Sequence, residues 1–463
     1  MNARTNKRYK NHAMTHQRRV WLPVLLAISV GAYAADIDLT LHAGDTYTDN
    51  ALRIPDGPSD NIGAAALKLD LSAQGEHYET DVRTALTYLH YFQGTQEDEV
   101  LRGFAGDVKF FIVPERFAWL IQENYGPVLE NPLSPDRPDN WTYDSYFTTG
   151  PDVQVGDSSQ FHVLVSGRYS RADYESDQVP SNEQYIGLVS FALGGDAGNE
   201  RSLQLSAKRV EEQALAKPPL SLPANGYDIQ EAYLRWVKDL KRGGFYIDAG
   251  GTSLSDEGVT TQSPLLRVGF DRTVSRTLTL SMGAGTQYSD NLKRFARLQD
   301  NSPDVDDPRQ DITPTTKPLQ EDYVDAIVEF VSSRTTAALR VAYNKLEQQD
   351  TLSPLADQNY SNITLDFSRQ ISPRFSLQLG AMFDQRDYGE ASRKDDDTFA
   401  FLAGAWRLDR NLEARLTLRR QERDSSDPAS DFVEQSVQLE FVYYAYERKE
   451  PRRNHSFMNR NLR

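Results

Sequence analysis

Histidines are scarce in this chain, and they decide how much acid–base chemistry it can perform. Two of the seven lie in the first 34 residues, and the others are His42, His77, His90, His162 and His455. A serine hydrolase needs a histidine within hydrogen-bond reach of its nucleophile. His162 shares one face of an extended segment with Ser166, but four residues of strand separate their side chains by roughly 13 Å. No Gly-x-Ser-x-Gly sequence lies nearby. We therefore expect no catalytic residue, and a serine on a neighbouring strand stays open as a partner for His162.

Two acidic runs come nearest to a metal site. Asp395-Asp396-Asp397 and residues 304–307 (Asp-Val-Asp-Asp) could offer carboxylates to Ca²⁺. Neither run matches the spacing of a twelve-residue calcium loop, and no His-x-x-x-His or His-Glu-x-x-His spacing occurs after residue 34. We expect both runs to be solvated loop residues and the chain to hold neither a metal nor a cofactor.

The first 34 residues carry the marks of a secretory signal peptide. Six cations and no acid precede an apolar run from Val20 to Val30, and Ala32-Tyr33-Ala34 supplies a small-x-small cleavage pattern. The apolar run is about 11 residues long, whereas a helix that spans a membrane needs about 20. We predict export and a mature chain that starts at Ala35, with an uncleaved anchor as the alternative.

Composition narrows the class of protein. The formal net charge is −16 and becomes −22 when the six leader cations are removed. So acidic a surface disfavours nucleic acid, whose phosphates require a basic partner. The chain contains no cysteine, which excludes disulfides and thiolate metal sites. Its mean hydropathy of −0.61 resembles that of a soluble protein, but a membrane barrel exposes apolar side chains only at every second position and has the same ordinary average.

Alternation of apolar and polar residues with a period of two dominates the rest of the sequence. Residues 278–284, 375–384, 412–419 and 433–443 all follow it, in segments of about 9 to 13 residues. This pattern is typical of strands with two unlike faces. Helical spacing does not organise these segments, and the nearest helical candidate, residues 228–240, also fits a strand.

Two kinds of connection alternate along the chain. Short ones contain an acid, Ser or Pro followed by Arg, as at residues 114–117, 274–276 and 372–375. Longer polar ones are rich in Pro, Gly, Asp and Asn; they fall at 48–61, 127–141, 213–226, 291–319, 350–358, 389–396 and 424–430. Short turns at one end and long loops at the other are the organisation of outer-membrane barrels, whose short turns are periplasmic.

Strand length indicates that one face contacts lipid. Strands of soluble sandwiches usually have about five or six residues, whereas about nine to eleven tilted residues span a bilayer. In hydrocarbon each unpaired backbone group costs several kcal/mol, so a sheet there must close on itself. We therefore predict an all-β transmembrane antiparallel β-barrel of about 16–20 strands over residues 35–446, in the bacterial outer membrane. A soluble sandwich or propeller is the alternative.

Charged residues occur on the face that this barrel would turn inward. A barrel of this size is too wide for its side chains to fill, so these charges either line a passage for a hydrophilic solute or pair with one another in a polar lumen. The predicted lumen-facing residues include Arg83, Arg168, Arg209, Asp325, Glu329, Arg340, Arg415, Arg419 and Glu440.

Aromatic residues gather at the ends of the alternating segments. Amphipathic rings in that position form interfacial girdles in membrane barrels, although strands of any kind are enriched in aromatic residues. The predicted girdle residues are Phe117, Trp119, Tyr169, Tyr288, Tyr343, Tyr388, Tyr443 and Tyr444.

A turn-rich motif follows the first predicted strand. It reads Asp49-Asn50-Ala51-Leu52-Arg53-Ile54-Pro55-Asp56-Gly57. This stretch resembles an opening motif of the putative beta-barrel porin 2 family, in which a first strand runs into Asp-Asn-x-φ-Arg-φ-Pro-Asp-Gly, φ being apolar. The resemblance implies an outer-membrane barrel that accompanies exopolysaccharide biosynthesis or export, with no catalytic residues to carry over. The same residues are turn formers and could simply shape the first long loop.

The last 17 residues, 447–463, form a cation-rich tail beyond the last predicted strand. It either contacts an acidic partner or is inert. For the whole chain we expect a porin-like role in the passage or handling of polysaccharide or another hydrophilic solute. An outer-membrane hydrolase acting on lipid or polysaccharide and a non-conducting surface scaffold are the alternatives. The expected partners are outer-membrane lipid, the barrel-assembly machinery and polysaccharide.

Overall fold

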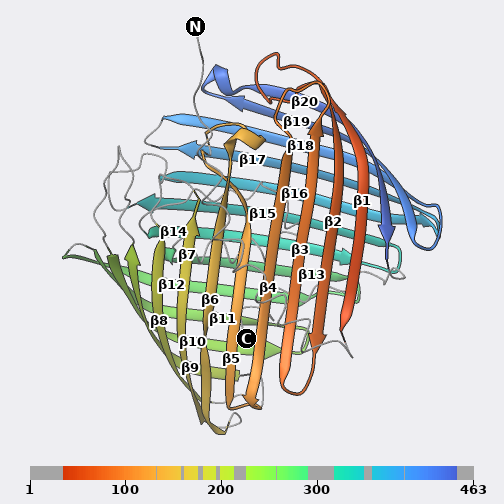
Figure 1. The fold of residues 1–463 in the computed structure, drawn as a ribbon. Helices are drawn as coiled ribbons and strands as arrows, with labels where there is room; N and C mark the ends of the chain where they lie inside the picture. The colour runs from red at the N-terminus through yellow and green to blue at the C-terminus, as the bar shows by residue number, and fades with distance from the viewer. Residues whose placement is uncertain are drawn as a thin grey trace, which may run out of the picture.

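The computed structural model is one antiparallel sheet of 20 strands that closes on itself (Figure 1). It describes residues 35–131, 133–157, 161–175, 181–193, 199–212, 226–256, 258–289, 318–348, 357–389 and 392–445. The strands are β1 (Asp36–Thr48), β2 (Asp60–Gln74), β3 (Tyr78–Tyr91), β4 (Glu99–Val113), β5 (Phe117–Leu129), β6 (Trp141–Asp157), β7 (Phe161–Tyr174), β8 (Asn182–Leu193), β9 (Asn199–Glu212), β10 (Gly226–Leu240), β11 (Gly243–Asp256), β12 (Val259–Thr273), β13 (Leu278–Ser289), β14 (Leu319–Val331), β15 (Thr335–Gln348), β16 (Gln358–Ser372), β17 (Phe375–Tyr388), β18 (Arg393–Arg407), β19 (Leu412–Ser425) and β20 (Phe432–Tyr444). Two short 3-10 turns, η1 (Pro138–Asn140) and η2 (Pro428–Ser430), lie between strands.

Closure of the sheet joins the first strand to the last. β1 pairs with β2 from Asp36↔Ser72 to Thr48↔Asp60 and with β20 from Thr40↔Tyr444 to Thr48↔Ser436. Every other strand pairs with its two neighbours in the chain, so the sheet has no free edge among the described residues. In Figure 1 the strands of the near wall, β1 to β5, cross those of the far wall at a steep angle, as strands tilted within a barrel do. The predicted all-β antiparallel barrel of about 16–20 strands is confirmed at its upper count.

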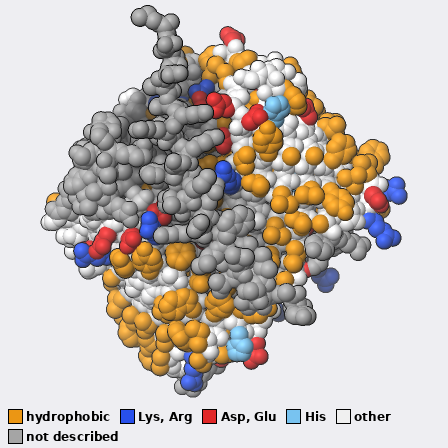
Figure 2. Space-filling model, viewed as in Figure 1, with side chains coloured by type: hydrophobic (Ala, Val, Ile, Leu, Met, Phe, Trp, Pro, Cys, Tyr) orange, Lys and Arg blue, Asp and Glu red, His pale blue; other side chains and the backbone are white. Residues whose placement is uncertain are grey.

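The period-two alternation produces two unlike faces. On β19 and β20, Leu418 and Val437 are paired and point outward, and both are exposed. Arg419 and Ser436 form the next pair and point inward. The same parity continues around the sheet, and most of the large exposed apolar side chains lie on the outer face. Figure 2 shows these hydrophobic side chains spread over the visible wall, with charged side chains toward its ends.

Aromatic side chains form two belts on the outer face, one near each end of the strands. One belt contains Trp119, Phe161, Phe191, Trp236, Phe330, Trp406 and Tyr443, and the other contains Tyr47, Tyr88, Phe92, Tyr185, Tyr343 and Phe383. The girdle prediction is therefore right for Trp119, Tyr343 and Tyr443. It is wrong for Tyr388 and Tyr444, which are buried on the inward face. Tyr288 is also buried, in a hydrophobic cluster that includes Val210 and Leu254.

Connections at the two ends of the barrel differ in length, as predicted. The end that carries the β1–β2, β5–β6 and β19–β20 connections is called the long-loop end, and the other is the short-turn end. Three connections at the long-loop end were not predicted: residues 92–98, residues 175–181 and the two residues, 257–258, between β11 and β12. Residues 228–240, the best helical candidate, are part of β10. Among the described residues no helix has the length and apolar character to cross a membrane.

Candidate functional site: the lumen wall and its mouth

The structure places eight of the nine predicted lumen residues on the inward face. They are Arg83, Arg168, Asp325, Glu329, Arg340, Arg415, Arg419 and Glu440, and all are half-buried. They come from β3, β7, β14, β15, β19 and β20, so they line different sectors of the wall. They do not form one site.

Arg209 is the exception. It pairs with Tyr185 and Asp228 on the outer face, and its side chain is 65% exposed. It lies near the long-loop end of β9 and bonds Glu211, with 3.1 Å between Nε of Arg209 and Oε1 of Glu211. The prediction that Arg209 faces inward was wrong, because near a strand end an outward charge can reach water beyond the apolar belt.

Arg415 and Glu440 do meet, at the seam where β20 joins β1. A nitrogen of Arg415 lies 3.5 Å from Glu440 and another lies 3.2 Å from Glu413. Glu440 is also bonded to Nδ1 of His42 at 2.9 Å. Opposite charges from β19 and β20 thus neutralise each other beside the seam, and His42 on β1 adds a hydrogen bond across it.

The best catalytic candidate does not assemble into a hydrolase site. Ser166 donates its hydroxyl hydrogen bond to Asp152 at 2.7 Å, and Arg168 binds the same carboxylate oxygen at 2.5 Å. Nδ1 of His162 is buried and has no hydrogen-bond partner within the described part of the chain. Ser166 is thus engaged by Asp152 instead of by a histidine.

A second arginine cluster lies on β10 to β12. Asp248 is fully buried and accepts hydrogen bonds from Arg235 at 2.8 and 2.9 Å and from Arg267 at 3.0 Å. The Arg267 guanidinium also lies 4.6 Å above the Tyr233 ring, within cation–π range. One carboxylate therefore holds two cations against the lumen wall.

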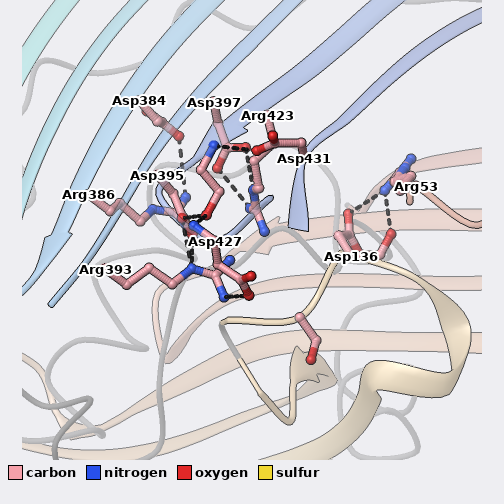
Figure 3. A network of polar contacts seen from close by, with 12 residues as sticks. Arg53, Asp136, Asp384, Arg386, Arg393, Asp395, Asp397, Arg423, Asp427 and Asp431 are labelled. Carbon is pink, nitrogen blue, oxygen red and sulfur yellow. Dashed lines mark hydrogen bonds and ion pairs between the residues drawn. The ribbon is translucent and has the colours of Figure 1, made fainter. Parts of the chain in front are cut away.

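We call the opening at the long-loop end the mouth. The mouth network is a set of side chains on β17 to β19 and the β19–β20 connection: Asp384, Arg386, Arg393, Asp395, Asp397, Arg423, Ser425, Asp427 and Asp431. Figure 3 shows most of these residues. Arg423 binds Asp397 with two parallel hydrogen bonds of 2.7 and 2.8 Å. Asp395 is fully buried and accepts from Arg393 at 2.8 Å and from Ser425 at 2.6 Å. The network makes this sector of the long-loop end rigid and charged.

The mouth network also corrects the expectation for the acidic run. Asp395-Asp396-Asp397 is part of β18 and not of a solvated loop. Asp395 and Asp397 point inward to arginines, while Asp396 points outward and bonds Gln385. Within the described residues no group of three His, Cys, Asp or Glu side chains is placed to hold a metal ion. The other acidic run, residues 304–307, lies outside the described residues.

The motif after the first strand builds a tight loop around Asn50. The Asn50 amide donates to the carbonyls of Ile54 at 2.8 Å and Val433 at 3.1 Å, and its oxygen accepts from the Ile54 backbone N–H. Gly57 packs against that amide so closely that a Cβ there would overlap Oδ1 of Asn50. Arg53 and Asp56 adopt left-handed backbone angles, with φ of 51° and 53°. Asn50 thereby fixes the loop to β20, the last strand.

Arg53 extends this loop across the mouth. Its Nε donates to Glu434 at 2.8 Å, and its Nη1 donates to the backbone and side-chain oxygens of Asp136 at 2.5 and 3.1 Å. Figure 3 shows Arg53 pointing at Asp136, which lies in the β5–β6 connection. Burial alone would lower the pKa of Arg53, but the carboxylates of Glu434 and Asp136 raise it above its ordinary value. We call Arg53, Asp136 and Glu434 the mouth latch.

Sequence reasoning missed the arginine–aspartate pairs of the mouth network and the Asp248 cluster. Arg393, Asp395 and Asp397 follow the same every-second-residue pattern as the inward residues further along β18, and this pattern could have identified them. It was missed because residues 389–396 were predicted to be a loop, whereas β18 begins at Arg393. Nothing in a single sequence indicates the partners of Arg53, which are 83 and 381 residues away.

Comparison with protein families supports the resemblance seen in the motif. Residues 323–444 match the family model described as "Putative beta-barrel porin 2". The match covers β14 to β20, whereas the motif lies at the other end of the chain. Over these residues the family prediction is confirmed.

Comparison with solved structures finds other large barrels. The siderophore receptor PirA from Pseudomonas aeruginosa aligns over 89% of this chain and 80% of its own, with 10% identity and a TM-score of 0.43. The FrpB iron transporter from Neisseria meningitidis aligns over 88% and 82%, with 8% identity and a TM-score of 0.45. A PfeA receptor variant from Pseudomonas aeruginosa in complex with enterobactin aligns over 88% and 81%, with 10% identity and a TM-score of 0.49. Likenesses this weak carry no argument about a ligand. No curated protein matches the chain.

Proposed function

We propose that this chain, whose residues 323–444 match the putative beta-barrel porin 2 family, is a non-enzymatic outer-membrane protein that passes a hydrophilic solute through its lumen. One observation carries the proposal: a closed sheet with an apolar outer face between two aromatic belts and a charged inner face. A bilayer solvates such an outer face, and aromatic belts lie at its two interfaces. The long-loop end is then extracellular and the short-turn end periplasmic.

We further propose that the solute is a polysaccharide made or exported by the same cell. The support is the motif from Asp49 to Gly57 together with the family match at residues 323–444. A polymer of sugars is hydrophilic, so a lumen of charged and amide side chains suits it better than an apolar tunnel would. This role needs no catalytic residue, in keeping with the engagement of Ser166 by Asp152.

Reconstitution tests the passage role. The protein, refolded in detergent, is added to planar lipid bilayers, and stepwise ionic currents are expected. A heat-dependent shift on a detergent gel first verifies that the barrel has formed. A correctly folded barrel that never conducts would overturn the passage role and leave a surface scaffold.

A genetic experiment tests the polysaccharide role. Deletion of the gene in its native cell is expected to reduce released exopolysaccharide while the intracellular precursors accumulate. Complementation with the unaltered gene serves as the control. If the deletion strain releases as much exopolysaccharide as before while the purified barrel conducts in vitro, the protein is a channel but polysaccharide is not its solute.

A further inference from the structure

We propose that the lumen wall on β18 and β19 carries a binding track for saccharides that bear carboxylates. The track consists of Phe399, Phe401, Arg419 and Gln421, which are half-buried and face inward. This inference rests on the proposed passage of a hydrophilic solute and names its chemical class.

The phenyl rings are the first observation. The centroids of Phe399 and Phe401 lie 6.0 Å apart, with ring planes inclined at 47°. A phenyl ring cannot hydrogen-bond to water as a polar side chain does, and covering it with an apolar surface is favourable. The exposed parts of these two rings are therefore suited to a ligand with an apolar surface. The C–H face of a sugar ring provides one while its hydroxyls stay hydrated.

The neighbouring strand holds the second ring flat against the wall. Phe401 pairs across the ladder with Gly380 on β17, and any Cβ at that glycine would overlap the ring. The absence of a side chain at Gly380 leaves the space that the Phe401 ring occupies. A ring supported in this way is fixed in place for stacking on a sugar.

Polar side chains alternate with the rings at the same depth. Phe401 is paired with Arg419, and Phe399 with Gln421. Arg419 donates to the amide oxygen of Gln438 at 3.1 Å, so a neutral group helps to hold its guanidinium in place. A guanidinium can bind a carboxylate with two parallel hydrogen bonds, while amides bind hydroxyls. The combination of phenyl rings, a guanidinium and an amide fits an acidic saccharide better than an apolar solute.

The track also continues from the mouth. Asp397 and Arg423, the strongest pair of the mouth network, occupy the next inward positions above Phe399 and Gln421. Toward the short-turn end come Thr417 and Ala403, which are small and buried. A saccharide chain that enters at the mouth would therefore meet Phe399 and Phe401 directly after the mouth network.

Current blockade by two defined sugars tests the track. Tetragalacturonate is the acidic probe and maltotetraose the neutral one, each added to planar bilayers that contain the refolded barrel. Both are expected to interrupt the current, and the acidic sugar is expected to bind about tenfold more tightly, as one charge-assisted contact would give. Equal binding of the two sugars would overturn the role of Arg419.

Two variants separate the contribution of the Phe401 ring to sugar binding from that of the Arg419 guanidinium. Phe401→Leu keeps an apolar side chain without a stacking face and should weaken both sugars by about tenfold, while Phe401→Tyr should restore them. Arg419→Gln should remove only the preference for the acidic sugar. Phe383→Leu on the outer face of β17 is the matched control and should change neither. Each variant must keep its heat-dependent gel shift, which separates lost binding from a barrel that failed to form.

The outcomes distinguish the track from the passage role. A conducting barrel that neither sugar blocks, or a Phe401→Leu variant blocked like the unaltered protein, would overturn the track and leave passage intact. If the barrel does not conduct, sugar binding is measured by calorimetry in detergent. Binding that depends on Phe401 then supports the track without passage, and no binding overturns both.

Discussion

Arg53 and Glu434 are 381 residues apart in the chain, and their side chains meet at 2.8 Å. Arg53 belongs to the loop after the first strand, and Glu434 belongs to the last strand. The other oxygen of Glu434 accepts a hydrogen bond from the Thr48 hydroxyl at 2.8 Å. The family-like motif therefore links the loop after the first strand to the last strand, and through Asp136 it also contacts the β5–β6 connection.

Loss of the Arg53 side chain should weaken the anchoring of the loop at residues 49–59. Arg53→Gln removes charge-assisted contacts to two carboxylates, and we expect the loop to lose on the order of 2 kcal/mol of anchoring. Faster proteolytic cleavage within residues 49–59 and a higher single-channel conductance would report this. The control is Arg420→Gln, whose partner Glu422 is exposed, because such a surface pair contributes little. Identical cleavage of both variants would show that the latch does not hold the loop.

Gly57→Ala should reproduce the Arg53 phenotype by another route. The new Cβ would displace the Asn50 amide, which otherwise bonds the carbonyls of Ile54 and Val433. We expect the same increase in cleavage while the gel shift of the barrel persists. Gly187→Ala, where a Cβ meets nothing within 4 Å, is the control. Normal protection of the loop in Gly57→Ala would contradict the packing described for Asn50.

The latch should resist alkaline conditions. Although burial opposes the charge, Glu434 and Asp136 raise the pKa of Arg53 above its ordinary value, which is already strongly basic. A group with a raised pKa stabilises the fold at every pH below its unfolded value and loses that contribution only as the pH rises through the folded one. Conductance and loop protection should therefore stay constant from neutral pH to about pH 10. A rise in conductance that needs Arg53 within this window would contradict the assignment.

Asp248→Asn should destabilise the barrel and change its ion selectivity. The carboxylate is fully buried between Arg235 and Arg267, and removing one member of a buried ion pair costs about 3–5 kcal/mol. We expect the gel shift to occur at a lower temperature and the reversal potential to move toward anion preference. Asp45→Asn on the outer face of β1 is the control. Unchanged selectivity would mean that ions do not pass this sector of the wall.

Leu234→Arg should impair folding, whereas Leu188→Arg should not. Leu234 is 65% exposed on the outer face near the middle of β10. An arginine at the midplane of a bilayer costs about 2–4 kcal/mol in such barrels. Leu188 points inward from β8, where water in the lumen can solvate the new charge. Refolding yields in lipid vesicles measure the difference, and equal yields would argue against lipid on the outer face.

Much of the fold was predictable because one physical rule repeats along the whole chain. The alternation at residues 412–419 fixes the face of Arg415 and Arg419, and similar segments supply nearly all the strands. The rule weakens at strand ends, since beyond the apolar belt lipid no longer dictates which face is polar. Tyr388, Tyr444, Arg209 and Asp395 all lie there, and all were misassigned.

The partners at the mouth were beyond prediction for a different reason. The cross-strand pair Asp397–Arg423 depends on register, which one residue of slip would alter. Arg53 needs both the closed sheet and the β5–β6 connection before its two acids come together. The predicted leader, most of the 291–319 loop and the tail at 447–463 lie outside the described residues.

The pairing of β1 with β20 also sets the order of events during folding. Neighbouring strands can zip together from hairpins whose ends are close in sequence, but Thr40↔Tyr444 joins residues about 400 positions apart. Such a contact has a large entropic cost of loop closure and forms slowly. Closure of the ring is thus expected to follow the pairing of the hairpins, and until it occurs the first and last strands each keep an unpaired edge.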